Sequence, residues 1–410
     1  MIKAITGTKD ILPNEIRNWY FLENTVRKIM NSFNYKEIRT PIFEETRLFS
    51  RGIGESTDIV SKEMYTFLDR SETSITLKPE MTASVVRALL EHSLDKQSQL
   101  NKLFYISPMF RQERPQAGRF RQFHQFGAEA LGSTSAALDA EMILLAYQIL
   151  KTLGLSNFTV KINSLGVPSS RENYKNLLKE YLADKLNELS EESKKRYGAN
   201  ILRLFDSKDE RDKKIMENAP LLIEHLDNES LEHFEEVKQL LLSAGVPYEV
   251  DPKLVRGLDY YTHTTFELVS GSVGSQAALC GGGRYDLLVK QLGERDVPGV
   301  GFAAGMERIL LAMANENVLQ EYKTELDYYI VRLNKELNKK VFEIAAKLRA
   351  NFSVEFDYTQ RSVKAQMREA NKLGARKVIM IGGEEYERGM AVVKNMEDGS
   401  QTEISVNELV

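Results

Sequence analysis

The chain has 410 residues, a formal net charge of −4 and 42 % hydrophobic residues, which suits about two or three globular domains with sizeable cores. Its single cysteine, Cys280, excludes an internal disulfide framework and a CxxC metal knuckle, as is common in a reducing cytosol. No stretch approaches the roughly 20 apolar residues of a membrane span, and the start, MIKAITGTKD, has no apolar signal core. We therefore expect a cytoplasmic protein with no membrane partner, in which nucleic-acid contacts depend on local basic patches.

Changes in sequence pattern divide the chain into four segments. Residues 1–167 mix helical stretches with short strands, and residues 168–243 are highly charged and helical in pattern. Strands and glycine turns return in residues 244–320. From 326 to 410, strand and helix patterns alternate, which predicts a separate small α/β domain with its own core.

The helical segment ends in NESLEHFEEVKQLLLSAG, which has apolar residues at intervals of three and four. A polar start at Asn228 or Ser230 and a stop at Gly245 predict a capped helix there. His225 and His233 lie in this charged segment without other metal-ligand residues nearby in the sequence, so we expect no metal site.

Nearer the start of the chain, SITLKPEMTASVVRALLEH predicts a strand that leads into a helix, with Glu80 at the junction. A carboxylate at such a junction can serve a bound ligand or cap the helix. This stretch alone leaves both interpretations open.

An antiparallel hairpin is predicted over residues 103–131, where LFYISPMFRQE and FHQFGAEAL flank the turn RPQAG. Side chains two positions apart share one face of a strand. The residues that share one face of this hairpin are Arg111, Glu113, Phe123, Gln125, Gly127 and Glu129. Such a face suits a ligand with phosphates, an amine and an aromatic base, for which Gly127 would leave space. The alternative is a solvent-exposed hairpin held by salt bridges.

Three stretches follow the helical segment. LVRGLDYYTHTTFEL is strand-like, and Tyr260 is expected in the core because it faces away from its neighbour Tyr261. ALCGGGRYDLLVKQLG lacks the spacing and lysine of a phosphate loop, so its glycines predict a tight turn. VPGVGFAAGMERILLAM runs from a strand into a helix with Arg308 in its first turns, where the dipole disfavours a cation by up to about 1 kcal/mol unless an anion binds. The alternative is a surface arginine paired with Glu307.

In the C-terminal segment, Lys364, Arg368 and Lys372 recur at every fourth position of a predicted helix and form one basic ridge. Such a ridge is either a solvated helix face or a set of phosphate contacts. The sequence does not decide between these two interpretations.

The stretch FRQERPQAGRFRQFHQFGAE resembles motif 2 of the class II aminoacyl-tRNA synthetases, and GVGFAAGMERIL resembles motif 3. NYKEIRTPIFE is similar to motif 1, the dimer-forming element of these enzymes. LVRGLDYY and GGGRYD resemble the two histidine-binding signatures of the histidyl-tRNA synthetases, and the likeness covers effectively the full chain. One departure is LKPEMTA, where Lys78 and Met81 replace the usual bacterial Arg and Gly.

The resemblance implies that the chain joins L-histidine to ATP, accompanied by Mg²⁺, and transfers the histidyl group to tRNA(His). The positions that match the family's phosphate-binding cations are Arg111, Arg119, Arg256 and Arg308. Of these, Arg111, Arg256 and Arg308 are the expected catalytic residues, since each fixed donor contributes about 2–4 kcal/mol to such a transition state. Phe123 would stack on adenine, and Glu113 would accept from its amino group.

The positions that match the family's histidine-binding residues are Glu80, Thr82, Gln125, Glu129, Arg256, Tyr261 and Tyr285. The first three would bind the α-ammonium group. Glu129 and Tyr261 would bind the two separated ring nitrogens of the imidazole. Buried polar groups left unpaired by a wrong amino acid would disfavour it by roughly 10⁴-fold.

For tRNA, the resemblance implies acceptor-end contacts at the motif 2 turn, where Arg114, Gln116 and Arg121 lie. It also implies anticodon binding by the C-terminal domain, which carries the ridge of Lys364, Arg368 and Lys372. Motif 1 implies a homodimer.

We therefore expect an α+β class II synthetase fold. Its catalytic domain, an antiparallel sheet flanked by helices, would comprise residues 1–167 and 244–320, with a helical insertion at 168–243 and an α/β anticodon-binding domain at 326–410. One alternative is a histidine-sensing regulatory subunit of ATP phosphoribosyltransferase, but those relatives generally lack the C-terminal domain and the RGLDYY signature. A synthetase for another amino acid is opposed by both histidine signatures.

Overall fold

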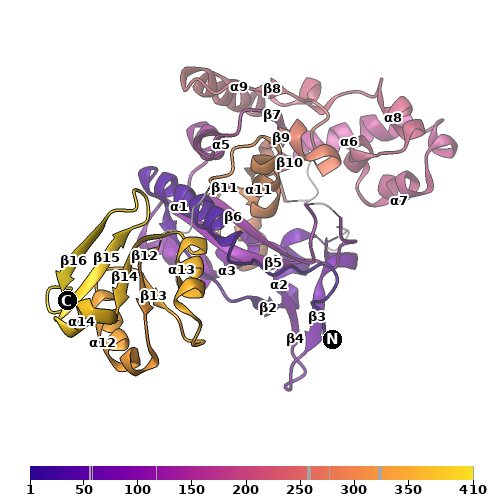
Figure 1. Ribbon diagram of the computed structural model, residues 1–410. Helices are drawn as coiled ribbons and strands as arrows, with labels where there is room; N and C mark the ends of the chain where they lie inside the picture. The colour runs from indigo at the N-terminus through magenta and orange to yellow at the C-terminus, as the bar shows by residue number, and fades with distance from the viewer. Residues whose placement is uncertain are drawn as a thin grey trace. The chain divides into compact units, whose positions relative to one another are not determined.

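The computed structural model describes residues 1–54, 57, 59–116, 118–255, 260–276, 278–321 and 326–409. The chain divides into two compact units, Met1–Leu319 and Gln320–Val410 (Figure 1). Each unit has its own sheet and its own hydrophobic core. None of the helices in these described stretches has the length and hydropathy that a membrane crossing requires.

The first unit is built on an eight-stranded sheet with the order β1-β5-β6-β11-β10-β9-β7-β8. Its strands are β1 Lys36–Glu37, β5 Asn101–Phe110, β6 Gln122–Leu131, β7 Phe158–Ser164, β8 Glu249–Val250, β9 Thr262–Ser270, β10 Ala278–Arg284 and β11 Gly299–Gly305. The inner strands pair antiparallel, as expected, whereas β1 and β8 add to the two edges in parallel. Parallel pairing requires a long crossover, which the helical segment supplies between β7 and β8. The sheet is therefore mixed and not purely antiparallel.

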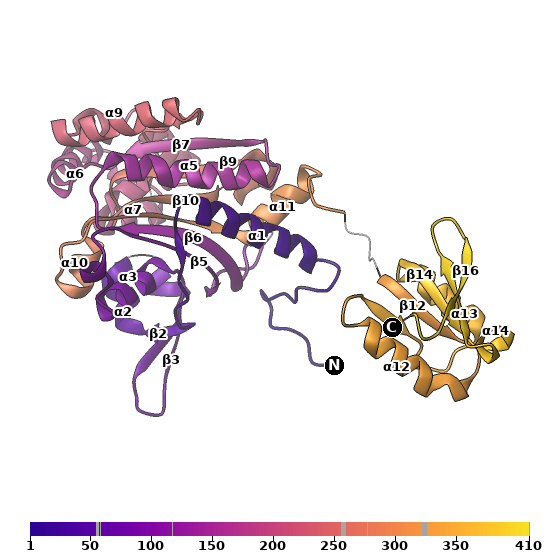
Figure 2. The same ribbon diagram turned by 90° about the vertical axis from the view of Figure 1, so that its left-hand side faces the viewer.

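Helices cover one face of this sheet (Figure 2), namely α1 Ile16–Ser32, α5 Ala136–Thr152, α9 Asn228–Ser243 and α11 Met306–Asn315. They pack against alternate strand residues such as Phe126 and Ala128 of β6. Helix α5 begins after Ser135, whose hydroxyl accepts from the N–H of Ala137 at 3.2 Å, a cap that stabilises a helix by about 1 kcal/mol. Because strand side chains alternate, the intervening residues of β6 face the opposite side of the sheet.

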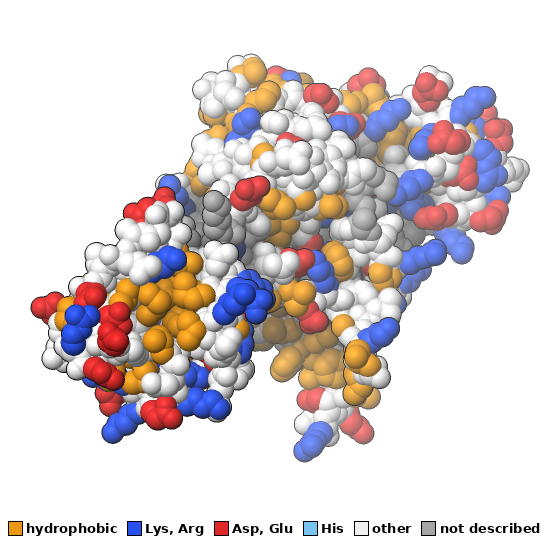
Figure 3. Space-filling model, viewed as in Figure 1, with side chains coloured by type: hydrophobic (Ala, Val, Ile, Leu, Met, Phe, Trp, Pro, Cys, Tyr) orange, Lys and Arg blue, Asp and Glu red, His pale blue; other side chains and the backbone are white. Residues whose placement is uncertain are grey.

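On that opposite side lies a three-stranded sheet with the order β2-β4-β3, made of β2 Phe43–Glu45, β3 Tyr65–Leu68 and β4 Ser74–Leu77. Strand β4 leads into helix α3, Thr82–Glu91, so the predicted strand-to-helix junction at Glu80 is present. The remaining helices on this side are α2 Thr46–Ile53, the π-helical turn η1 Ile59–Glu63, α4 Leu94–Gln97 and α10 Leu288–Gly293. Figure 3 shows hydrophobic side chains gathered over this small sheet, where Ile42, Phe43, Phe67 and Leu68 are exposed.

The chain between β7 and β8 forms the helical insertion. Besides α9 it contains α6 Pro168–Leu182, η2 Leu186–Glu188, α7 Glu191–Ala199, η3 Ile201–Asp206, α8 Glu210–Met216 and η4 Leu222–His225. Helix α9 has the predicted extent, but its cap is neither Asn228 nor Ser230. The cap is Asp227, whose carboxylate accepts from the N–H of Ser230 at 2.9 Å.

The second unit contains a five-stranded sheet with the order β13-β12-β14-β15-β16. Its elements are β12 Leu326–Arg332, η6 Lys335–Leu337, α12 Asn338–Leu348, β13 Val354–Phe356, α13 Val363–Lys372, β14 Ala375–Ile381, α14 Gly383–Glu387, β15 Met390–Asn395 and β16 Gln401–Ser405. Strands β13 and β14 both pair with β12 in parallel. Helix α12 packs on the face that carries Ile330, and α13 packs on the face that carries Tyr329. The alternation of strand and helix expected after residue 326 is therefore present.

The helices of the insertion are joined through one buried carboxylate, that of Asp212 on α8. Its Oδ2 accepts from the hydroxyls of Ser190, Ser193 and Ser207, each at 2.6 Å, and its Oδ1 accepts from the N–H of Ser190 at 2.8 Å. Although burial opposes ionisation, these hydrogen bonds lower the pKa of Asp212 to about 2. The ionised carboxylate therefore connects α8 to the start of α7 and to the end of η3.

Replacement of Asp212 by alanine should destabilise the insertion. The substitution leaves buried donors without an acceptor, at about 1–3 kcal/mol each, so we expect the free energy of unfolding to fall by at least about 2 kcal/mol. Denaturant unfolding followed by circular dichroism would measure this. The control is Glu210→Ala on the same helix, which removes only an exposed ion pair with Lys213 and should change stability by less than about 1 kcal/mol. Equal effects of the two substitutions would contradict the role assigned to Asp212.

Candidate active site

A pocket of about 200 Å³ opens on the face of the large sheet that α1 and α5 leave uncovered. The residues singled out in the sequence that line it are Glu80, Thr82, Arg111, Glu113, Arg119, Phe123, Gln125, Tyr261, Tyr285 and Arg308. They come from segments far apart in the chain, which the sheet brings to one place. Arg256, also expected here, lies outside the described residues.

The predicted hairpin of β5 and β6 forms the floor of the pocket, with Ser107 paired to Gln125 and Leu103 paired to Glu129. Strand β5 ends at Phe110, so Arg111 lies beyond the strand. The N–H of Arg111 nevertheless donates to the carbonyl oxygen of Arg121 at 2.9 Å, which continues the pairing toward the turn.

Gly127 has a different role from the one predicted. A Cβ atom on Gly127 would lie 2.4 Å from the hydroxyl oxygen of Tyr105 and 2.3 Å from the carbonyl oxygen of Phe302. The space beside this glycine is therefore filled by Tyr105, which is fully buried, and not reserved for a ligand. Gly301 is the glycine that admits a functional group, because its Cβ would lie 1.8 Å from a carboxylate oxygen of Glu129.

Glu129, also expected in the pocket, is 1 % exposed and is not among the residues that line it, but it contacts two that do, Thr82 and Tyr285. Its carboxylate accepts from the hydroxyl of Thr82 at 2.8 Å and from the hydroxyl of Tyr285. Burial raises the pKa of Glu129 to about 8, and these two hydrogen bonds only partly oppose that shift. An uncharged Glu129 beside the pocket as it stands is therefore favoured at neutral pH.

Glu80 combines both interpretations that the sequence left open. It lines the pocket, and its carboxylate accepts from the N–H groups of Thr82 at 2.7 Å and Ala83 at 2.9 Å in the first turn of α3. Burial nevertheless raises the pKa of Glu80 above its usual value. The same carboxylate thus caps the helix and faces the ligand space.

The cationic end of the pocket is lined by three guanidinium groups, two of which contact the carboxylate of Glu113. Arg111 and Arg119 lie 3.7 Å and 3.2 Å from the carboxylate of Glu113. Arg308 is held in place by donating from Nε to the carbonyl oxygen of Gly118 at 3.0 Å. Burial first, and then the charge of Arg119, lower the pKa of Arg308. This end carries an excess of positive charge that a bound anion would relieve.

Arg308 does not pair with Glu307, so the alternative of a surface ion pair is wrong. The carboxylate of Glu307 accepts from the backbone N–H of His124 at 2.9 Å and lies 2.9 Å from its Nδ1. Arg308 instead points into the pocket from the first turn of α11.

Two tyrosines that were not among the expected pocket residues lie in or beside the pocket. Tyr260, expected in the core, lines the pocket beside Tyr261, with their ring centroids 4.8 Å apart. The core prediction for Tyr260 is confirmed, since it is 6 % exposed and packs with Tyr261 and Tyr285, and it lines the pocket as well. Alternation along a strand is not the reason, because β9 begins only at Thr262. Tyr105 was missed, and its only sequence signal was its place opposite Gly127 in the hairpin.

The residues expected to contact tRNA lie on the surface, with one exception. Arg114 and Gln116 are exposed at the motif 2 turn. Arg121 instead donates from Nη1 to the carbonyl oxygen of Thr6 at 3.3 Å, and its N–H donates to the carbonyl oxygen of Gly7. In the second unit, the ridge of Lys364, Arg368 and Lys372 is exposed along α13.

Within the described parts of the chain, no group of three or more His, Cys, Asp or Glu side chains is arranged to hold a metal ion. His225 packs its ring beside Tyr174, and His233 contacts Asp139. Both histidines therefore have partners within the protein.

Two family models match the chain: histidyl-tRNA synthetase over residues 7–309 and an anticodon-binding domain over residues 327–410. The chain belongs to the histidyl-tRNA synthetase family. It is 48 % identical over 410 residues to the histidine–tRNA ligase of Halothermothrix orenii, covering 100 % of this chain and 98 % of the relative. It is also 48 % identical over 408 residues to that of Microcystis aeruginosa, covering 99 % and 95 % of the two chains.

The structure is similar to apo histidyl-tRNA synthetase of S. aureus, with a TM-score of 0.84 and 38 % identity over 100 % of this chain and 98 % of the other. The class II fold expected from the sequence is therefore confirmed. A second structure, an ATP phosphoribosyltransferase regulatory subunit/histidyl-tRNA synthetase from Bacillus halodurans, shares the fold at 23 % identity and a TM-score of 0.67, over 93 % of this chain and 99 % of that one.

The two departures from the histidyl-tRNA synthetase pattern contact each other. Lys78 and Met81 are both buried, and Nζ of Lys78 lies 3.6 Å from the sulfur of Met81. A shorter cation and a larger neighbour thus occur together as one local change. Burial lowers the pKa of Lys78 to about 8.

The raised pKa of Glu129 predicts a pH-dependent stability. Between pH 4.5 and about 8 the folded protein binds a proton that the unfolded chain releases, so this group makes the free energy of unfolding fall as pH rises. Glu129→Gln removes that dependence. The free energy of unfolding of the variant minus that of the original protein should be larger at pH 8 than at pH 5, by at least about 1 kcal/mol. Denaturant unfolding at both pH values measures this, and a constant difference would show that Glu129 is already ionised at pH 5.

Proposed function

We propose that this pocket activates L-histidine with ATP and that the chain transfers the histidyl group to the 3′ end of tRNA(His). The observation that carries the proposal is the polarity of the pocket. Glu80 lines one end, where the buried Glu129 contacts the wall through Thr82 and Tyr285, and three arginines line the other end. This arrangement suits a cationic amino acid facing a polyphosphate.

In the activation step, a carboxylate oxygen of histidine attacks the α-phosphorus of ATP. A bond to that phosphorus forms, the bond from it to the bridging oxygen of pyrophosphate breaks, and pyrophosphate leaves. Arg111 and Arg256 would stabilise the charge on the α-phosphate, and Arg308 would hold the γ end with Arg119. No general base is required, because the attacking carboxylate is already ionised at neutral pH.

Selection of histidine would depend on the acidic end. Gln125 has a buried side-chain oxygen for which no hydrogen-bond partner is present, so it can accept from the α-ammonium group together with Glu80 and Thr82. Glu129 and Tyr261 would bind the ring nitrogens, with Tyr285 fixing the orientation of Glu129. A side chain without two separated nitrogens would leave these groups unpaired.

The nucleotide would occupy the other end. The ring of Phe123 offers a stacking surface for adenine, and the guanidinium of Arg111 already lies 5.4 Å from its centroid. Glu113, which contacts two arginines, is the carboxylate in the described part of this end that can accept from the adenine amino group or share Mg²⁺ with the phosphates. Bound Mg²⁺ would neutralise part of the phosphate charge.

The remaining proposals concern macromolecular partners. Arg114, Gln116 and Arg121 at the motif 2 turn would meet the acceptor end of tRNA, with Arg121 first leaving Thr6. The ridge on α13 would contact the anticodon arm.

A homodimer would form through the small sheet around Phe43 and Phe67, whose exposed apolar side chains are unusual for a monomer surface. The cytoplasm, which holds ATP and tRNA, would be the site of action.

Histidine-dependent exchange of pyrophosphate with ATP tests the activation step. The purified protein should exchange only when histidine is present. Arg308→Ala should lower the exchange rate by about 100-fold or more, as should Arg256→Ala, because each removes one charge-stabilising group. The control is Arg388→Ala, which removes an exposed ion pair with Glu403 in the second unit. A protein that binds histidine without any exchange would support a regulatory role instead.

The role of the ridge can be tested by replacing Lys364, Arg368 and Lys372 with glutamine. Activation of histidine should survive, whereas affinity for tRNA should fall and its dependence on salt should flatten by up to about one logarithmic unit per lost phosphate contact. Measurement of Kd against salt concentration gives both quantities.

The matched control for the ridge removes three exposed lysines on the α12 side of the same unit, Lys335, Lys339 and Lys347. Its salt dependence should stay that of the original protein. Identical slopes for all three proteins would show that the ridge is a solvated helix face.

A further inference from the structure

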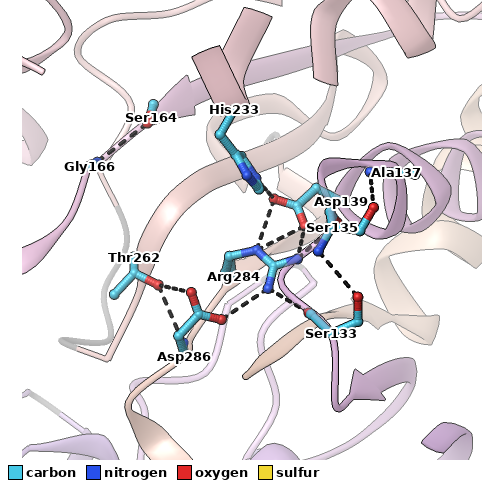
Figure 4. A network of polar contacts seen from close by, with 10 residues as sticks. All are labelled: Ser133, Ser135, Ala137, Asp139, Ser164, Gly166, His233, Thr262, Arg284 and Asp286. Atoms are coloured by element: carbon cyan, nitrogen blue, oxygen red, sulfur yellow. Dashed lines mark hydrogen bonds and ion pairs between the residues drawn. The ribbon is translucent and has the colours of Figure 1, made fainter. Parts of the chain in front are cut away.

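Behind the amino-acid end of the pocket lies a fully buried guanidinium, that of Arg284 at the end of β10 (Figure 4). It donates to both oxygens of Asp139, to Asp286 at 2.9 Å and to the carbonyl oxygens of Ser133 at 3.0 Å and Ser135 at 3.2 Å. A guanidinium has five N–H donors, and these contacts use all of them. Arg284 is not among the residues that line the pocket.

The first set of contacts made by Arg284 fixes the backbone next to Tyr285, which forms one wall of the pocket. Tyr285 follows Arg284 directly and donates its hydroxyl to Glu129. Because Arg284 is fixed to the start of α5 through Ser135 and Asp139, the backbone that carries Tyr285 has little freedom to shift. The position of the Glu129 carboxylate therefore depends on a contact outside the pocket.

The second set of contacts, through Asp286, fixes the backbone next to Tyr261, which forms another wall of the pocket. Asp286, which accepts from Arg284, has a backbone N–H that donates to the hydroxyl of Thr262 at 3.3 Å. Thr262 follows Tyr261 in the chain. One guanidinium thus connects the two segments that resemble histidine signatures.

The network also contacts the helical insertion, through His233 and Asp139. His233 of α9 lies with Nε2 2.8 Å from the other side of the Asp139 carboxylate, and its ring packs beside that of His263 with centroids 5.0 Å apart. Burial opposes ionisation of Asp139, but the contacts with His233 and Arg284 outweigh it and lower its pKa. Since ionised Asp139 only accepts, Nε2 of His233 donates.

We propose that Arg284 and Asp139 are positioning residues that hold both walls of the histidine pocket, and that His233 links the insertion helix α9 to this pocket. The inference rests on the proposed function, because it assumes that the pocket binds histidine. A binding group is held in its productive geometry by side chains that are themselves fixed by packing and hydrogen bonds. The network supplies that support from behind without touching the substrate.

The decisive variant replaces both charges at once, Arg284→Met with Asp139→Leu. Substitution of a buried ion pair by apolar side chains of similar volume often preserves folding, whereas removal of one partner does not. We expect the KM for histidine in pyrophosphate exchange to rise about tenfold or more, because small displacements of a binding group have large effects. The KM for ATP should stay within about twofold, since Arg111 is held by Pro79 and Glu113, and Arg308 by Gly118 and Ala278, rather than by the network.

The matched control is the buried pair Arg332 and Asp357 of the second unit, replaced in the same way by Met and Leu. It should change thermal stability without changing either KM. A folded Arg284→Met/Asp139→Leu protein with the original KM for histidine would overturn the proposal. So would equal changes in the KM values for histidine and ATP.

The link to α9 has its own test, which also serves if the double variant does not fold. His233→Leu removes the donor to Asp139 and should raise the KM for histidine by about threefold or more, whereas the amide of His233→Gln can still donate and should restore it. An unchanged KM in His233→Leu would overturn the link. If the original protein showed no histidine-dependent exchange, the proposed function itself would be contradicted. That result can be told apart from an unchanged KM for histidine in the variants, which would overturn only the positioning roles.

Discussion

The whole catalytic unit depends on the alternation of side chains across one central strand, β6. Phe126, Ala128 and Ala130 enter the core under the helices, while Phe123 and Gln125 on the other face line the pocket and Glu129 on that face contacts its wall. A shift of one residue in register would exchange the two sets and bury the polar ones under α1 and α5. The packing of the core therefore fixes the orientation of the pocket residues, and folding and function share one constraint.

The pocket keeps its charges apart because buried charges are costly unless they are paired. At one end, Glu80 and Glu129 are satisfied by backbone N–H groups and hydroxyls and are shifted toward the neutral form. At the other end, Arg111 and Arg119 pair with Glu113 while Arg308 donates to backbone carbonyl oxygens, which leaves a net positive charge. The pocket is therefore electrostatically complementary to a ligand with opposite charges at its two ends.

Support for this pocket comes from regions that do not line it. Arg284, Asp139 and His233 bring β10, α5 and α9 together behind the histidine end. The helical insertion, whose sequence is highly charged, therefore contacts the buried carboxylate of Asp139 through His233, and the same carboxylate holds Arg284 beside the pocket wall. At the opposite end, the segment around Gly7 holds Arg121 of the motif 2 turn. Both ends of the site are thus braced by parts of the chain distant in sequence.

The sequence by itself determined the features that depend on neighbours along the chain. These are the hairpin, the junction at Glu80, the α/β pattern after residue 326 and the motifs that indicate the family, since periodicity and spacing are local properties. Only the tertiary structure decided which group fills each space. Tyr105 occupies the room beside Gly127, Thr6 binds Arg121, and Arg284 finds four of its five acceptor atoms on the stretch from Ser133 to Asp139. Except for Tyr105, which the hairpin pairs with Gly127, such partners are set by long-range packing between stretches far apart in sequence, so local patterns do not reveal them.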